Sequence, residues 1–240
     1  SCLGLHSVNS ERELIYIENV STVKKYCNDL TTKTVLTLKK RRNSEWFPLC
    51  LYCSPSTGDL LIGKRRFDTK ESKITRYNKL GTLTHTIQND KKGQALYKFP
   101  GCITENNNGD VVVSDIIDES HGAVVVTDHD GRHRFSYTEN PLVSGFLPLV
   151  ICTDTFLNIL VCDIKSGSVH VIQKNGQPGG IWRHILNQLG STLTPMSLSY
   201  DVKSHLLWVG SLEENVVYAF RYIYRHPHLT GTFYFSSTYL

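Results

Sequence analysis

A unit opened by proline and repeated along the chain constrains the fold more than any other feature of this sequence. Pro48, Pro100, Pro148 and Pro195 each begin a short apolar run, and they lie 52, 48 and 47 residues apart. A polar turn and a second apolar run follow each of them, without the three- to four-residue period of an amphipathic helix. A period of roughly 40–50 residues with four short strands is typical of a β-propeller blade. The sequence therefore predicts an all-β propeller of four-stranded blades.

Five such blades are visible. We place them at residues 1–39, 46–87, 99–138, 147–186 and 194–223. Residues 224–240 do not match the repeat, and we predict either an unmatched tail or one closing strand. An open array of blades would leave exposed sheet edges. Either the five blades close on themselves, or a further blade lies upstream of Ser1.

Composition narrows the class of protein. The chain has 240 residues, of which 40% are hydrophobic and 20% charged, as in ordinary globular proteins. Its longest apolar stretch, 146–162, contains Pro148, Asp154 and Asn158, which argues against a membrane-spanning helix and a membrane partner. The count of seven cysteines is odd and no signal peptide opens the chain, which favours a reduced, cytoplasmic protein. Because Ser1 is not an initiator methionine, we expect a piece of a longer protein.

Strand order converts sequence position into surface position. In a four-stranded meander, the links between strands 2 and 3 and between successive blades lie on one rim. Here those links are long and charged. They are basic in the first blades and acidic in the later ones, at Asp115 to Glu119, Glu139, Asp163-Ile164-Lys165 and Glu213-Glu214. Long loops on a rigid scaffold often carry binding sites. We predict a ligand-binding face formed by Lys40, Arg41, Arg42, Trp46, Lys64, Arg65, Arg66, Phe67, Lys91 and Lys92.

Two ligands fit a basic face of this kind. An acidic peptide or a negatively charged protein surface would match it by charge complementarity. Structured RNA is the alternative, because basic loops can follow a phosphate backbone while Trp46 and Phe67 stack on bases. A net charge of +4 is modest for a nucleic-acid-binding domain, which favours the protein ligand.

Motifs for metal binding and catalysis are weak. Cys50-Leu51-Tyr52-Cys53 places its cysteines on opposite faces of a strand and has no second cysteine pair at zinc-finger spacing. Asp128-His129-Asp130-Gly131 contains the Asp-Gly pair of a hairpin tip. The innermost strands carry no recurrent set of ligands for a metal in the central channel. We therefore predict no catalytic residue, no metal site and no cofactor within this chain.

The middle of the chain resembles the NHL-repeat propellers of tripartite-motif proteins, especially their molluscan set. The runs that carry the resemblance are Ile74-Thr75-Arg76-Tyr77, Asn89-Asp90-Lys91-Lys92-Gly93-Gln94-Ala95-Leu96-Tyr97, Ile103-Thr104-Glu105-Asn106 through Val113-Ser114-Asp115, Ala123-Val124-Val125-Val126, and Gly131-Arg132-His133-Arg134-Phe135-Ser136-Tyr137-Thr138. The resemblance extends from about Cys2 to Ile223. It implies a six-bladed NHL propeller, of which this chain would supply five blades.

The resemblance also implies a function. Members of this family are RING-type E3 ubiquitin-protein ligases, in which the propeller selects the substrate protein or, in some members, an RNA hairpin. The resemblance places a RING, B-boxes and an oligomerising coiled coil at the N-terminal side of the propeller. This sequence contains none of the zinc-binding Cys/His runs of a RING or B-box, so zinc would be bound only upstream. This chain is then expected to be a non-catalytic recognition module of a ubiquitin ligase.

Overall fold

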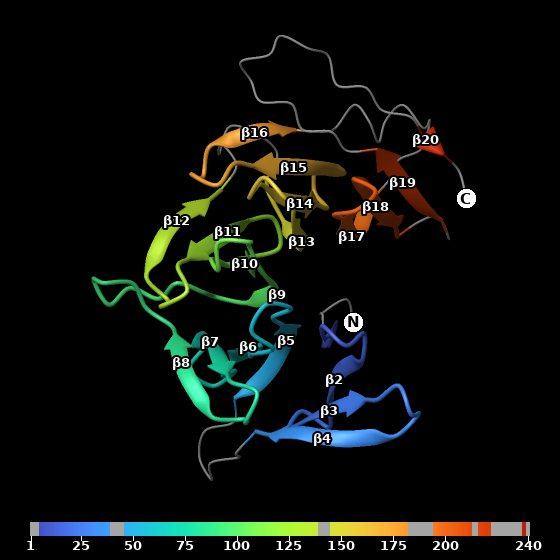
Figure 1. Cartoon of the computed structure of the whole chain (residues 1–240). Coiled ribbons are helices and arrows are strands. Elements are labelled where there is room, and N and C mark those ends of the chain that lie inside the picture. The colour runs from blue at the N-terminus through green and yellow to red at the C-terminus, as the bar shows by residue number, and fades with distance from the viewer. Residues whose placement is uncertain are drawn as a thin grey trace.

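Five antiparallel sheets form an arc in the computed structural model of this chain (Figure 1). The structure describes residues 5–38, 46–138, 145–181, 194–212, 216–221 and 237–238. Each sheet has four strands connected as a simple meander, so that every strand pairs with its neighbours in the sequence. The predicted all-β propeller of four-stranded blades is confirmed. Within the described residues there is no helix that could cross a membrane.

The first three blades account for most of the described chain. Blade 1 consists of β1 (His6–Val8), β2 (Leu14–Glu18), β3 (Thr22–Tyr26) and β4 (Thr32–Thr37). Blade 2 consists of β5 (Phe47–Cys53), β6 (Leu60–Arg65), β7 (Ser72–Tyr77) and β8 (Leu83–Ile87). Blade 3 consists of β9 (Pro100–Glu105), β10 (Val111–Ile116), β11 (Gly122–Thr127) and β12 (His133–Tyr137).

The last two blades include a strand from the C-terminal tail. Blade 4 consists of β13 (Pro148–Thr153), β14 (Ile159–Asp163), β15 (Ser168–Ile172) and β16 (Pro178–Ile181). Blade 5 consists of β17 (Pro195–Asp201), β18 (Leu206–Ser211), β19 (Val217–Arg221) and β20 (Ser237–Thr238). The two residues of β20 pair with Ala219 and Phe220 of β19, so this part of the tail adds the fourth strand of the blade.

Successive blades pack face to face, which explains the unbroken apolar runs in the middle strands. Alternate residues of a strand point to opposite faces of its sheet. In β10, Val111 and Val113 pack in the core between blades 2 and 3, whereas Val112 packs in the core between blades 3 and 4. Both faces are therefore buried, and a strand buried on both faces carries apolar residues at every position.

The five blades form an open arc rather than a closed five-bladed ring. The first strands β1, β5, β9, β13 and β17 pack on one another in succession, which places them on the inner side of the arc. Among the described strands, no comparable packing joins blade 5 to blade 1. Figure 1 shows these two blades at the two ends of the arc.

Tight turns of one kind close the hairpins. In the turn 78–82, the Asn78 side chain accepts the backbone N–H groups of Leu80 and Thr82, at 3.0 and 2.9 Å. Gly81, at the fourth position of this turn, has φ +75°. This left-handed conformation strains any residue with a Cβ atom, so glycine is the residue that fits best. The hairpin 128–132 repeats the arrangement, with Gly131 at φ +85°.

Replacing Leu30 with glycine should stabilise the protein. Leu30 occupies the equivalent position in the turn 27–31 with φ +65°, and it is 75% exposed, so its side chain contributes little burial. Relief of left-handed strain outweighs the entropy that glycine adds to the unfolded chain, and we expect a gain of about 0.5–1 kcal/mol. Urea denaturation measures it. The matched control, Gly131→Ala, should destabilise, because its Cβ would lie 2.8 Å from Ile87 Cγ1. A less stable Leu30→Gly variant would refute the strain argument.

Candidate functional site

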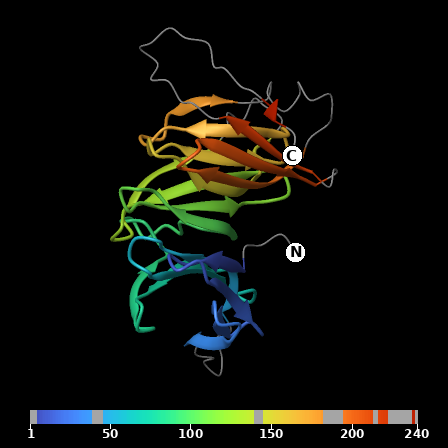
Figure 2. The ribbon, with the colours of Figure 1, turned by 45° about the vertical axis from the view of Figure 1, so that its right-hand side comes forward.

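The loops of the propeller gather on two rims, at opposite ends of the strands (Figure 2). One rim carries the links between strands 2 and 3 of each blade and the links between blades, and we call it the connector rim. Its described segments include 66–71, 88–99, 117–121 and 164–167. The opposite rim carries the turns between strands 1 and 2 and between strands 3 and 4, and we call it the turn rim. It includes 9–13, 54–59, 78–82, 106–110, 128–132 and 154–158.

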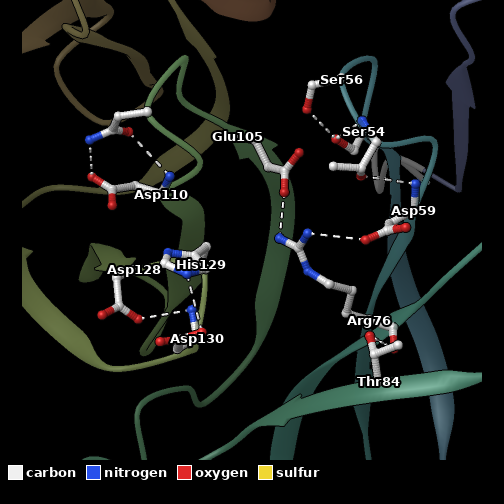
Figure 3. Close-up of polar contacts among 12 residues, drawn as sticks. Ser54, Ser56, Asp59, Arg76, Thr84, Glu105, Asp110, Asp128, His129 and Asp130 are labelled. Carbon is white, nitrogen blue, oxygen red and sulfur yellow. Dashed lines mark hydrogen bonds and ion pairs between the residues drawn. The ribbon is translucent and has the colours of Figure 1, made fainter.

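On the turn rim of blades 2 and 3, several charged groups are paired with one another. Arg76 of β7 lies between two carboxylates, Glu105 at the end of β9 and Asp59 just before β6, and its Nη1 is 3.3 Å from Asp59 Oδ2 (Figure 3). Arg76 and Glu105 are both buried. Nearby, Arg134 pairs with Asp110 in the same way. The Arg76–Asp59 and Arg134–Asp110 pairs lie within blades 2 and 3, and the Arg76–Glu105 pair joins the two blades, which indicates a structural role for this part of the turn rim.

Arg65, a predicted ligand residue, holds the connector rim together. Its guanidinium donates a hydrogen bond to the carbonyl of Lys98, in the link between blades 2 and 3. It also lies over the rings of Phe99 and Phe67, at 5.3 and 6.0 Å from their centroids. Phe67 makes an edge contact with Phe47, with centroids 5.2 Å apart. This cation–aromatic cluster fixes the link to blade 3 and leaves Phe67 55% exposed.

The other predicted cations differ in whether a carboxylate already neutralises them. Arg66 pairs with Asp68 at 2.6 Å and with Glu71 at 3.6 Å, so its charge is largely compensated. Lys91 and Lys92 are exposed at the tip of the link between blades 2 and 3, and neither forms an ion pair within the described part of the chain. Lys40, Arg41 and Arg42 lie outside the described residues.

Asp115 and Asp163 do not lie on an acidic surface. For these two residues the prediction is wrong, because both carboxylates are buried and accept hydrogen bonds from the link that enters their blade. Asp115 accepts from the backbone N–H groups of Lys98 and Phe99, at 2.7–2.9 Å, and Asp163 accepts from that of Leu147 at 2.9 Å. Alternate residues of a strand face opposite sides of the sheet, and both aspartates are on the side that faces the preceding blade. This orientation buries them although each is next to a loop. Asp118 and Glu119 are exposed on the connector rim, whereas Glu139, Glu213 and Glu214 lie outside the described residues.

The two aspartates titrate differently. Burial raises the pKa of Asp115 to about 6, although the backbone N–H groups of Lys98 and Phe99 oppose the shift. Burial also raises the pKa of Asp163, but the nearby His170 ring, whose Nε2 lies 3.5 Å from Oδ2, and hydrogen bonds from Ser166 and backbone N–H groups outweigh it and leave that pKa below its ordinary value. Each aspartate therefore serves as an internal cap for its blade, and neither is a ligand group on the surface.

Lys64 lies inside a groove between blades 1 and 2, whereas a place on the exposed face was predicted. Its side chain is buried, and its Nζ donates a hydrogen bond to the Tyr77 hydroxyl at 2.8 Å. Lys73 stands beside it on β7, with Nζ 3.8 Å from the centroid of the Trp46 ring. The groove has a volume of about 590 Å³. Its lining comprises Leu36, Thr37, Leu38, Trp46, Lys64, Lys73, Thr75, Tyr77, Gly81, Thr82, Leu83 and Thr86.

The sequence interpretation missed Lys73 and Tyr77 as members of this groove. A usable signal was present, because alternate residues of a strand share a face, and Lys73, Thr75 and Tyr77 alternate along the strand that the structure shows as β7. Lys64 shares its face with Leu60 and Ile62, which pack toward blade 1. The same parity rule would thus have directed Lys64 and Lys73 into the space between blades 1 and 2.

Clusters typical of metal sites are missing from the described residues. No three His, Cys, Asp or Glu side chains converge there. In the hairpin tip 128–132, the Asp128 carboxylate accepts the backbone N–H of Asp130 at 3.0 Å (Figure 3). It also accepts the backbone N–H of Arg132 at 2.8 Å. Cys50 and Cys53 are free thiols that pack in different cores, one toward blade 3 and the other toward blade 1.

Comparison with solved structures shows the same fold at low sequence identity. A streptogramin B lyase matches with a TM-score of 0.66 and 16% identity, over 99% of this chain and 68% of its own. A catalytically inactive virginiamycin B lyase from Staphylococcus aureus, in complex with quinupristin, matches with a TM-score of 0.65 and 14% identity, over 98% of this chain and 69% of its own. A chain of a nidogen/laminin complex matches with a TM-score of 0.62 and 14% identity, over 90% and 74%.

These likenesses show the fold alone. The chain is a β-propeller like these structures, and proteins of this fold include enzymes as well as binding proteins. No protein-family model and no curated protein matches the sequence. Function must therefore be argued from the side chains on the rims and in the groove.

Proposed function

We propose that this propeller is a recognition module without catalytic activity of its own, which binds an acidic segment of a partner protein on the connector rim of blades 2 and 3. The observation that carries the proposal is the presence of uncompensated charge on that rim. Lys91 and Lys92 are exposed there without a carboxylate partner in the described chain, and Phe67, in another segment of the same rim, has a half-exposed ring. A rim that presents both free cations and an exposed aromatic ring suits a peptide that carries both acidic and apolar side chains.

The resemblance of the middle blades to NHL propellers of tripartite-motif proteins supports a finer version of this proposal. In that version the bound protein is the substrate of a cytoplasmic RING-type ubiquitin ligase that contains this chain. The experiment is to capture proteins on the isolated propeller and test them as substrates of the full-length protein, with a ubiquitin-charged E2. Ubiquitination of a captured protein is the expected result, and its failure for every captured protein would leave recognition without ligase function.

Reversal of charge at Lys91 and Lys92 tests the binding face. In the Lys91→Glu/Lys92→Glu variant, two exposed cations become anions, and affinity for a fluorescein-labelled octaglutamate peptide should fall at least tenfold, mainly through a slower association rate. Fluorescence anisotropy at low salt measures it. The matched control reverses two exposed lysines of the turn rim, Lys174→Glu/Lys203→Glu, and should keep most of the affinity. An equal loss of affinity in the two variants would show that binding depends only on the net charge of the protein, and it would exclude a specific binding face.

RNA remains the second candidate, favoured by the stacked arrangement of Arg65, Phe67 and Phe99. Bases can stack on an exposed ring of this kind while lysines contact phosphates. Binding to a structured RNA hairpin should then weaken steeply with salt, and Phe67→Ala should weaken it further without changing the salt dependence. An RNA affinity that is absent at low salt would remove this candidate.

A further inference from the structure

One position of the repeat reverses its charge between blades. Four residues occupy this position, each paired across the sheet with the proline that opens its blade: Lys64 with Pro48, Asp115 with Pro100, Asp163 with Pro148 and the neutral Ser211 with Pro195. In blades 3 and 4 the aspartate accepts backbone N–H groups and so secures the incoming link. A lysine ammonium has no lone pair with which to accept such bonds. Lys64 therefore cannot fix the link that enters its blade in the way that Asp115 and Asp163 do.

Lys64 is also placed where an ammonium group is costly. Only 6% of its surface is exposed, and among the described residues its Nζ has the neutral Tyr77 hydroxyl as its hydrogen-bond partner and no carboxylate. The residue directly opposite on β7 is another cation, Lys73, whereas Asp115 and Asp163 face Ala123 and Ser168. A buried charge without a counterion and a like-charged cross-strand pair both destabilise the folded state.

The groove around Lys64 has the size and the chemistry to supply the missing counterion from outside. Its volume of about 590 Å³ can hold several side chains of a peptide. One end of the groove is lined by Trp46, Lys64 and Lys73. Lys64 and Lys73 pair across β6 and β7 near the ends of these strands at the connector rim. The remaining lining from β4 and β8 is apolar or uncharged, and the described groove contains no acidic side chain that would repel an anion.

We propose that the cationic end of this groove, at Lys64 and Lys73, binds the carboxylate of an Asp or Glu side chain from the protein segment that crosses the connector rim. This inference deepens the function proposed above and rests on it. The bound carboxylate completes a buried ion pair, for which Lys64 is already in position and desolvated. Lys64 thus lowers the stability of the free protein in exchange for ligand binding, as is common at functional sites.

The groove predicts a pH dependence that distinguishes Lys64 from surface lysines. Burial, with a contribution from Lys73, lowers the pKa of Lys64 to about 8. The titratable groups that line the groove are Lys64, Lys73 and Tyr77, and burial raises the pKa of Tyr77, so Tyr77 remains neutral in this range. Loss of the Lys64 proton above pH 8 should therefore weaken binding, whereas the exposed Lys91 and Lys92 still carry their charge.

The test compares Lys64→Met and Lys64→Arg with the unsubstituted protein, using the fluorescein-labelled octaglutamate peptide as the probe. We expect Lys64→Met to bind at least tenfold more weakly at pH 7 and to raise the Tm by about 2–4 °C, because a costly buried charge is removed. Lys64→Arg should retain binding and lose the decline between pH 7 and 9, because a guanidinium stays protonated. Unchanged affinity in Lys64→Met, or no binding of octaglutamate by the unsubstituted protein, would overturn the inference.

Two further arms separate this inference from its alternatives. If inorganic phosphate displaces the probe at concentrations at which acetate does not, the groove is a phosphate site and the carboxylate assignment is overturned. If Lys91→Glu/Lys92→Glu abolishes binding while Lys64→Met does not, the proposed function stands and the groove is excluded. If only Lys64→Met weakens binding, the groove is supported and the rim is not.

Discussion

Replacing Arg76 with alanine is expected to lower the free energy of unfolding by about 3–5 kcal/mol, the usual cost of removing one partner from a buried ion pair. Arg76 bridges blades 2 and 3 by contacting Asp59 and Glu105, and both Arg76 and Glu105 are buried. Without the guanidinium, two carboxylates would face each other across the blade interface with no counterion. Urea denaturation at neutral pH, followed by circular dichroism, measures the loss.

Two comparison variants separate charge from packing. Arg132 pairs with Asp128 and Asp130 at a hairpin tip, but its side chain is 59% exposed, so Arg132→Ala should change stability by at most about 1 kcal/mol. Arg76→Met combined with Glu105→Gln keeps most of the buried volume and removes one of the stranded carboxylates. It should recover part of the stability lost in Arg76→Ala. If Arg76→Ala and Arg132→Ala were equally mild, the trio would not be the link between blades 2 and 3.

Periodicity alone was sufficient to predict the blades, because the physics that sets them is local. Each strand is a short apolar run, and turn residues such as Asn78 and Gly81 close the hairpins through their own side-chain hydrogen bonds and backbone conformation. The two-sided burial of β10 also follows from sequence, since a run such as Val111-Val112-Val113 suits a strand covered on both faces. Closure of the ring did not follow, because it depends on packing between the first and last blades.

The candidate site was harder to predict, because loop position does not reveal the partners of a charge. Arg65 and Arg66 are neighbours in sequence, yet one is held by the carbonyl of Lys98, 33 residues away, and the other by Asp68. Lys64 is one residue from the loop, but strand parity turns it into the groove. A prediction from sequence could have used parity for Lys64, whereas the contact of Arg65 with the link to blade 3 required the folded arrangement.

The reversal from Asp to Lys at one repeat position is more informative than the total basic charge of the rim. Repeats supply an internal comparison, since Asp115 and Asp163 show what this position does when it serves the fold. Lys64 does not fix the incoming link, and its buried charge destabilises the fold. A residue of this kind at a structural position suggests selection for a function other than stability. Lys64 differs in this way from the other lysines and arginines among the 26 of the sequence, because it alone replaces an aspartate at this repeat position in the described blades.

The aspartate that blade 3 retains should give the protein a distinctive dependence of stability on pH. The pKa of Asp115 is about 6 in the folded protein, above the ordinary value of 3.8. Because the folded state holds the proton more tightly, its stabilising contribution is complete below pH 3.8 and is lost as the pH rises through about 6. A shift of about two pKa units corresponds to roughly 3 kcal/mol. The advantage of the unsubstituted protein over Asp115→Asn should therefore shrink by about 2–3 kcal/mol between pH 4 and pH 7.

Urea denaturation of both proteins at intervals across that range measures the change, and Asp118→Asn is the matched control on the same rim. Asp118 is exposed, and the backbone N–H of Ser120 and the side chain of His121 hold its pKa below the ordinary value. The contribution of the Asp118 carboxylate to stability is already complete above pH 4. The Asp118→Asn variant should therefore show the same decline in free energy of unfolding from pH 4 to pH 7 as the unsubstituted protein. Parallel curves for the unsubstituted protein and Asp115→Asn would mean that the backbone N–H groups of Lys98 and Phe99 stabilise the carboxylate enough to offset its burial.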